Sequence, residues 1–155
     1  MNKEKRIWIV LFLVLTLMVV LSGCSGLPKT AKINITIDPN PVPYSSENEN
    51  WPFDMVLDES NGIGVTLSSL RWDEYNLEEQ LIYTIIWYET NEEAITSLFG
   101  SNYLPAFSSL QNDFGYYIGP GAGDEFAQYI ILTFEGIDDN NNPIEATGRV
   151  DLLPQ

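Results

Sequence analysis

The sequence contains no histidine, one cysteine and only seven basic residues against 22 acidic ones. Without histidine there is no usual general base and no common zinc ligand, so serine triads, Cys–His dyads and zinc hydrolases are excluded. A Walker motif is also absent, because the glycine-rich stretch at Gly119–Gly123 lacks its lysine. Carboxylates are numerous enough that counting alone does not exclude a glycosidase pair. We nevertheless expect a protein that is not an enzyme, because such a pair needs a deep cleft that a small domain rarely offers.

The start of the chain has the pattern of an export signal. Lys3, Lys5 and Arg6 form a basic start, and the 15 residues Ile7–Leu21 are apolar except for Thr16. That length suits the apolar region of a signal peptide and falls short of the ~20 residues that cross a bilayer as a helix. An uncleaved N-terminal membrane helix is the alternative interpretation.

The apolar run ends in Leu21-Ser22-Gly23-Cys24, which resembles the lipobox of prokaryotic lipoproteins. The resemblance implies cleavage between Gly23 and Cys24 and a covalent diacylglycerol or acyl lipid on Cys24. Two or three acyl chains on one residue hold a protein firmly on a membrane. We therefore expect a signal peptide over residues 1–23, a lipidated tether over 24–30 and a folded domain over 31–155. The protein would then be exported and anchored on the extracytoplasmic side of the cell membrane or outer membrane.

The charge of the exported part limits its partners. Three of the seven basic residues and one of the 22 acidic residues lie in the leader, which leaves four against 21 and a net charge of about −17. Such a surface repels nucleic acid, so no nucleic-acid partner is expected. The expected partners are the membrane, through the lipid anchor, and a protein or an envelope polysaccharide. No cofactor is expected apart from the lipid.

Alternating apolar residues predict strands over Ile33–Asp38, Trp51–Asp58 and Ile63–Ser68. Prolines at positions 39, 41 and 43 indicate either a polyproline-like edge segment or a strand that switches sheets. Asn61-Gly62 is the strongest hairpin signal in the chain. The apolar character extends through Trp72 and Tyr75 into what is predicted to be a connection.

The run Gln80–Thr90 is apolar or aromatic at nearly every position, which predicts a central strand covered on both faces. Acidic residues from Asn91 favour the start of a short helix that ends at Gly100, with a loop as the alternative. Two weaker strand candidates and a terminal hairpin follow: 104–110, 114–118, and the hairpin arms 126–134 and 144–152.

Seven or eight short strands and one short helix predict an all-β fold, an antiparallel immunoglobulin-like β-sandwich. An eight-stranded barrel is the alternative. On its turns Asp58–Val65 and Phe134–Asn142, the chain resembles the small immunoglobulin-like domains of exported bacterial and archaeal lipoproteins. The resemblance implies a fold but no activity, and it carries over no catalytic residue.

Alternating oxygen side chains in one loop resemble the first half of a calcium loop. The candidate calcium ligands are Asp138, Asp139, Asn140 and Asn142. Pro143 stands where an EF-hand needs glycine and Arg149 where it needs glutamate, so an EF-hand is rejected. A looser sandwich-loop site and a plain hairpin turn both remain, because Asn and Asp also dominate turns.

Aromatic residues in the weaker elements are candidates for an exposed patch that stacks on sugar rings. These candidate ligand aromatics are Trp72, Tyr75, Tyr116 and Tyr117, with Tyr103 a further member of the patch. Trp51 and Trp87 lie on strongly apolar strands and are expected to fill the core. The sequence therefore predicts a non-catalytic binding module at the cell envelope. A carbohydrate-binding or carbohydrate-processing domain is the alternative.

Overall fold

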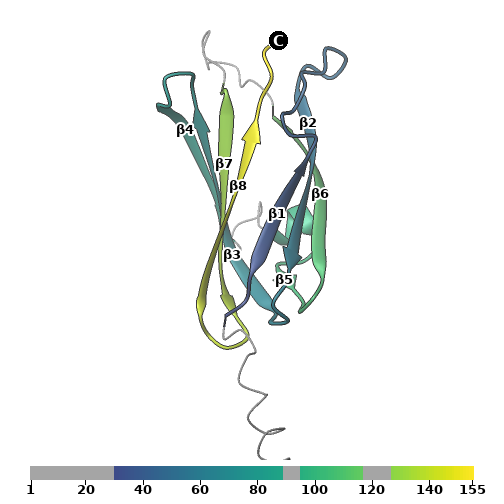
Figure 1. The fold of residues 1–155 in the computed structure, drawn as a ribbon, viewed down its shortest axis with the longest axis vertical. Helices are drawn as coiled ribbons and strands as arrows, with labels where there is room; N and C mark the ends of the chain where they lie inside the picture. Colours follow the sequence, from purple (N-terminus) through teal and green to yellow (C-terminus); the bar gives the residue numbers. More distant parts are fainter. Residues whose placement is uncertain (1–29, 89–94, 117–126) are drawn as a thin grey trace, which may run out of the picture.

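In a computed structural model, the chain is described over residues 30–88, 95–116 and 127–155, which form two antiparallel β-sheets packed face to face (Figure 1). The strands are β1 (Ile33–Asp38), β2 (Trp51–Glu59), β3 (Val65–Tyr75), β4 (Leu81–Tyr88), β5 (Tyr103–Leu104), β6 (Ser109–Tyr116), β7 (Tyr129–Asp138) and β8 (Pro143–Asp151). One helix, α2 (Ile95–Phe99), lies between β4 and β5. These elements confirm the all-β prediction with one short helix. Nowhere in the three described ranges is there a helix with the length and hydropathy to cross a membrane.

One sheet has the order β1-β2-β6, and the other has the order β4-β3-β7-β8, with β5 paired to the start of β3. The predicted terminal hairpin is confirmed as β7 and β8, whose pairing reaches Ile137 and Pro143 beside the turn. Both arms extend further toward the turn than the sequence indicated, so the connection is only Asp139–Asn142.

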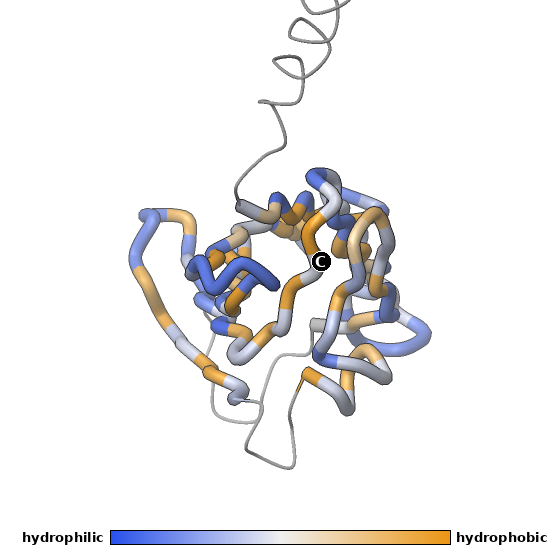
Figure 2. Tube along the Cα trace, turned by 90° about the horizontal axis from the view of Figure 1, so that it is seen from below, coloured by the Kyte–Doolittle hydropathy of each residue, from blue (hydrophilic) through white to orange (hydrophobic). Residues whose placement is uncertain are grey.

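The core fills the space between the two sheets. Its largest fully buried side chains come from both layers, as period-2 alternation requires, and include Trp51, Met55, Leu57, Leu70, Leu132 and Phe134. Figure 2 views the two layers end-on and shows hydrophobic and hydrophilic positions in both, and along β2 the buried positions are the alternate ones from Trp51 to Glu59. The predicted inward face of β2 is therefore confirmed, and Trp51 fills the core as expected.

The proline-rich segment after β1 crosses to the edge of the other sheet, and the chain then returns to the first sheet as β2. Val42 forms a parallel bridge with Leu152, and its N–H donates to the Asp151 carbonyl at 2.7 Å. The Asn40 amide donates to the Arg149 carbonyl and accepts from the Asp151 N–H, both at 2.8 Å. The crossing agrees with the interpretation of a segment that switches sheets, and it covers the end of the β8 edge at Arg149 and Asp151.

The predicted hairpin at Asn61-Gly62 is wrong. The strand before it, β2, pairs with β1 and β6, whereas β3 pairs with β4, β5 and β7. Gly62 does provide the turn, with φ of 78°. The turn chemistry fixes where the backbone reverses, but it does not decide which strands become neighbours, so this turn connects the two sheets.

The prediction of a central strand over Gln80–Thr90 is also wrong, because β4 lies at the edge of its sheet among the described strands; residues 89 and 90 lie outside the described ranges. Trp72 and Tyr75 belong to β3 and not to a connection. In place of the two weaker candidates at 104–110 and 114–118, the structure has β5 and β6, and residues 117 and 118 lie outside the described ranges. Strand β6 continues through residues 111–113, between the two candidates, because Gln111 and Asp113 are exposed on its outer face. Gly100 ends the helix as predicted, with φ of 74° and its N–H bonded to the Thr96 carbonyl. The helix start predicted at Asn91 lies outside the described residues.

Candidate functional site

The outer edge of β4, the side that faces away from β3, is the main candidate site. Strand β4 pairs with β3 from Ser69 to Tyr75. Within residues 30–88, 95–116 and 127–155, no strand pairs with its outer edge. The eight residues Leu81–Tyr88 (LIYTIIWY) contain no charged residue, no proline and no glycine. The edge thus combines strong β-forming side chains with a backbone able to accept another strand.

Four large apolar side chains of β4 are substantially exposed. The exposed fractions are 54% for Leu81, 56% for Tyr83, 42% for Ile86 and 48% for Tyr88. The register with β3 places Tyr83 on the same side of the strand as Ile85 and Trp87, and Ile86 and Tyr88 on the outer face. Several exposed large apolar side chains on one strand of an otherwise acidic domain mark an interaction site more often than chance exposure does. We therefore define Leu81, Tyr83, Ile86 and Tyr88 as the β4 patch.

The inward side chains of β4 hold the strand in place. Ile85 and Trp87 lie opposite Trp72 and Leu70 of β3 and pack against the core. The Trp87 ring meets the Trp72 ring edge-on, with ring centroids 6.1 Å apart. Strand β4 is thus fixed by packing from inside while its edge and outer face remain accessible.

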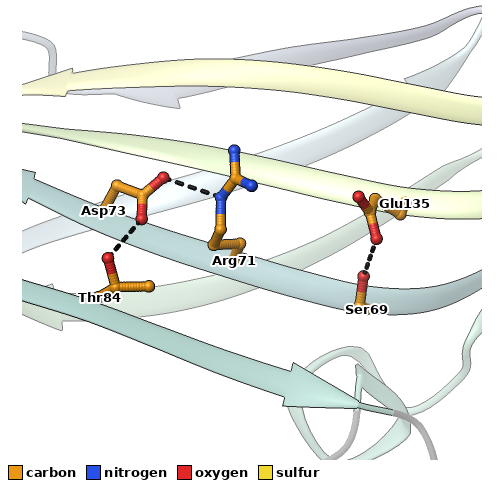
Figure 3. A network of polar contacts seen from close by, with 5 residues as sticks. All are labelled: Ser69, Arg71, Asp73, Thr84 and Glu135. Atoms are coloured by element: carbon orange, nitrogen blue, oxygen red, sulfur yellow. Dashed lines mark hydrogen bonds and ion pairs between the residues drawn. The ribbon is translucent and has the colours of Figure 1, made fainter.

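A polar network on the outer face also fixes β4 to its neighbour (Figure 3). Arg71 Nε donates to the Asp73 carboxylate at 2.8 Å, and Thr84 Oγ1 of β4 donates to the other oxygen of Asp73 at 2.7 Å. Further along β3, Ser69 Oγ donates to the Glu135 carboxylate at 2.9 Å. The only side-chain hydroxyl on β4 other than those of its tyrosines is therefore already engaged, and the exposed remainder of the strand is apolar and aromatic.

The other three sheet edges carry features that discourage pairing with a foreign strand. The segment Asn40–Val42 covers the end of the β8 edge, at Arg149 and Asp151, and β8 also carries Pro143 and the charged Glu145. In β1, apolar residues alternate with polar ones, and the strand is followed by Pro39 and Pro41. Strand β6 contains Asp113 and Gly115. Natural sheets blunt their edges with such prolines, charges and covering segments. In the described part of the chain, β4 is the edge that lacks all of them.

Trp72, predicted as a candidate for an exposed aromatic patch, is buried with 6% of its surface exposed. Its ring lies in the core, and its Nε1 donates to the Glu74 carboxylate at 3.0 Å. The predicted exposure of Trp72 is therefore wrong. Arg71 and Asp73 lie on the outer face of β3, and Trp72 between them lies on the inner face. In the sequence the two charged residues made this part of the strand look like a connection.

Tyr75 is stacked on Tyr129 across β3 and β7, with ring centroids 4.9 Å apart and planes 7° apart. The Arg149 guanidinium lies 3.8 Å from the centre of the Tyr129 ring. These contacts occupy ring faces that a sugar would need.

Tyr116 ends β6, and Tyr117 lies outside the described residues, as do Gly23 and Cys24. Sequence reasoning missed Tyr83 and Tyr88 because it treated their strand as covered on both faces.

The candidate calcium loop is a hydrogen-bonded turn in this structure. The buried carboxylate of Asp138 accepts from the backbone N–H groups of Ala31, Asn140 and Asn142 at 2.8 to 3.0 Å. Burial by itself would raise the pKa of Asp138, but these bonds and one from the Asn142 amide outweigh it and lower the pKa. Asp139 accepts from the Tyr103 hydroxyl at 3.1 Å. A calcium site here stays a prediction. Across the described ranges, no three His, Cys, Asp or Glu side chains are grouped to hold a metal.

Three carboxylates form a row across the outer face of the other sheet, which sequence reasoning did not identify. Asp54 of β2 lies opposite Asp38 of β1 and opposite Asp113 of β6. Loss of hydration, a hydrogen bond with Asp113 and the charges of Asp113 and Asp38 raise the pKa of Asp54. The row could be found only once the strand register was known.

No protein-family model and no curated protein matches the sequence. Among solved structures, the putative ApaA protein from Bordetella pertussis is 11% identical, with a TM-score of 0.51, over 81% of this chain and 98% of its own. A structural genomics target, SoR45, is 12% identical, with a TM-score of 0.44, over 81% and 89% of the two chains. The Pseudomonas fluorescens alkylpurine DNA glycosylase AlkC, bound to DNA containing an abasic site analog, is 9% identical, with a TM-score of 0.42, over 80% and 30%. The likeness to ApaA shows a shared fold alone.

Proposed function

We propose that the chain is an exported lipoprotein, anchored through Cys24, whose folded domain is a non-catalytic binding module. The basic start, the 15-residue apolar run and the small residues before Cys24 support export and lipidation. Without residues 1–23, the tether before the domain is short. Seven residues reach about 20 to 25 Å when extended, so the domain would stand close to the membrane.

We assign the domain to the immunoglobulin-like type of sandwich. Two observations support this assignment: a three-stranded sheet, β1-β2-β6, faces the sheet β4-β3-β7-β8, and consecutive strands β2 and β3 lie in different sheets. Such crossings between antiparallel sheets are the connections expected of a Greek-key sandwich. Immunoglobulin-like domains commonly act through exposed edges and loops on a rigid core, which fits a binding role.

The observation that carries the binding role is the β4 patch. It is a surface of four exposed apolar side chains along an uncharged edge strand, on a domain whose charge is about −17. Exposing it to water is unfavourable, and natural proteins normally protect such edges. A partner that covers the β4 patch at the membrane surface would remove this exposed apolar area from water.

Carbohydrate binding is a second candidate, supported by the exposure of Tyr83 and Tyr88. Its support is weaker than the sequence suggested, because Trp72 is in the core and Tyr75 is stacked on Tyr129. An envelope polysaccharide that bound here would have to use the two β4 tyrosines.

Site-specific photo-crosslinking in living cells tests the binding role. Tyr83 is replaced by a photoreactive phenylalanine derivative, and the exposed aromatic Phe107, outside the β4 patch, receives the same replacement as a control. We expect a discrete protein adduct in the membrane fraction from position 83 and none from position 107. Equal labelling at both positions, or no adduct from a protein that fractionates with membranes, would contradict a protein partner at β4. Adducts that disappear after polysaccharide digestion would favour the carbohydrate candidate.

A further inference from the structure

We propose that β4 accepts an added strand: an extended, basic segment of a partner protein pairs its backbone with the outer edge of β4. This inference rests on the proposed binding function and specifies its site and the chemistry of the partner. The structural basis is the juxtaposition of an unprotected edge, apolar flanks and a strongly acidic surround.

The backbone of β4 supplies the pairing groups. In an antiparallel sheet, half of the N–H and C=O groups of an edge strand point away from its one neighbour. For the eight residues of β4 this amounts to about four donors and four acceptors along the outer edge. A peptide that adds as a strand satisfies these groups directly, which is the mode of several peptide-binding domains.

The side chains of β4 provide apolar contacts on both faces of an added strand. The register with β3 places Ile85 and Trp87 on the core side and Ile86, opposite Arg71, on the outer face. Tyr83, Ile86 and Tyr88 are exposed beside the edge. Neighbouring strands lie about 4.8 Å apart, so alternate side chains of an added strand would contact these residues. A partner with apolar or β-branched residues in its centre fits this surface.

The surrounding charge selects a basic partner. Glu78 and Glu79 are exposed in the β3–β4 turn, and Glu135 is exposed on the outer face beside Ser69. Arg71 and Arg149, two of the three basic residues in the described ranges, are ion-paired with Asp73 and Asp151. The field near the edge is therefore negative, which attracts a cationic segment and repels a second copy of this acidic chain.

A peptide-binding measurement tests the inference on the full chain in a nonionic detergent. The probe is a capped, fluorescently labelled decapeptide, Lys-Lys-Val-Thr-Val-Thr-Val-Thr-Lys-Lys. One control peptide replaces every lysine with glutamate, and another carries N-methyl groups on alternate central residues, which removes backbone donors. Fluorescence anisotropy should show saturable binding of the lysine peptide and at least about tenfold weaker binding of both controls.

Two matched variants locate the site. Ile86→Lys places a charge on the outer face of β4, and Ile137→Lys makes the same change at an exposed position of β7 outside the patch. We expect Ile86→Lys to weaken peptide binding by about tenfold or more, and Ile137→Lys to change it by less than about threefold. Thermal melting of both variants checks that each is folded.

Strand addition is overturned if the lysine peptide does not bind, if N-methylation has no effect, or if the two variants weaken binding equally. Sedimentation showing a dimer that Ile86→Lys dissociates would assign the edge to a second copy and would likewise overturn the inference. These outcomes are separate from failure of the proposed function. Photo-crosslinking to a partner at Tyr83 without peptide binding would leave the binding module intact and remove only its strand-addition mode.

Discussion

The Glu59 carboxylate accepts a hydrogen bond from the backbone N–H of Phe107 at 3.1 Å, which ties the end of β2 to the segment that leads into β6. The same carboxylate also accepts hydrogen bonds from the backbone of the turn that follows β2. Its other donors are the backbone N–H groups of Lys32, Asn61, Gly62 and Ile63, at 2.7 to 3.2 Å. One buried acid therefore organises three segments that are far apart in the sequence.

Replacing this carboxylate should destabilise the domain strongly. Burial by itself would raise the pKa of Glu59, but the backbone hydrogen bonds from Phe107, Asn61, Lys32 and Gly62 outweigh it and lower the pKa. Glu59→Ala removes the acceptor of several partly buried N–H groups, so we expect a loss of about 2 to 3 kcal/mol in the free energy of unfolding at neutral pH. Urea denaturation measures it.

The pH dependence of the same variant follows from the sign of the pKa shift. A lowered pKa in the folded state contributes stability that is present above the unfolded value of about 4.5 and is lost as the pH falls through the folded pKa. The difference between wild type and Glu59→Ala should therefore shrink below about pH 4.5. A difference that stays constant down to pH 2 would show that the charge of Glu59 is not involved.

Asp54→Asn should stabilise the domain at neutral pH. The raised pKa of Asp54 means that the folded state binds its proton more readily than the unfolded state, so stability falls as the pH rises through that pKa. Removing the charge relieves repulsion from Asp38 and Asp113. We expect a higher melting temperature at pH 7 that is largest at low salt and disappears in acid.

Asp58→Asn is the matched control for that measurement. Asp58 lies on the same strand but opposite the neutral residues Asn34 and Ser109. Its replacement should have the smaller effect of the two. Equal stabilisation by both variants would mean that net charge, and not the row of three carboxylates, is responsible.

Gly148→Ala should destabilise the domain through a contact between the two sheets. A Cβ at position 148 would lie 2.8 Å from Cγ2 of Ile35 in β1. We expect a cost of about 1 to 3 kcal/mol, because overpacking of this kind forces the backbone or side chain to shift. A double-mutant cycle with Ile35→Ala, which removes that methyl group, should recover most of the cost. Independent, additive effects would place the strain elsewhere.

Calcium should leave the melting temperature unchanged. The oxygens of Asp138 already accept from backbone N–H groups, so a cation would have to displace Ala31, Asn140 or Asn142. Thermal melting in excess calcium and in chelator measures this directly. A rise in melting temperature with calcium, abolished by Asp139→Ala, would support the looser sandwich-loop site.

The sequence was sufficient for strands whose two faces differ in polarity. The alternation of β2 and of β8 predicted where these strands lie and which side chains share one face, because one face of each strand is buried and the other is exposed to solvent. For β4 this logic failed. A run that is apolar on both faces fits a covered central strand and an uncovered edge equally well, and only the sheet order separates them.

Contacts between residues that are distant in the sequence were the second feature that could not be predicted. The signal at Asn61-Gly62 located a turn but not the two sheets that it connects, and Arg71 and Asp73 concealed the burial of Trp72 between them. The buried roles of Glu59 and Asp138 depend on donors from segments distant in sequence. No local pattern contains that information, so the candidate site could be assembled only from the fold.

The chemical state of Cys24 in the native protein tests the proposed lipoprotein most directly. Mass spectrometry of the N-terminal fragment, purified from membranes, should show Cys24 as the first residue, carrying a diacylglycerol or acyl lipid. Cys24→Ala should abolish this product while leaving the fold intact, because the residue precedes the first strand. A wild-type N-terminus with unmodified Cys24, or with residues 1–23 still attached, would contradict membrane anchoring through a lipid.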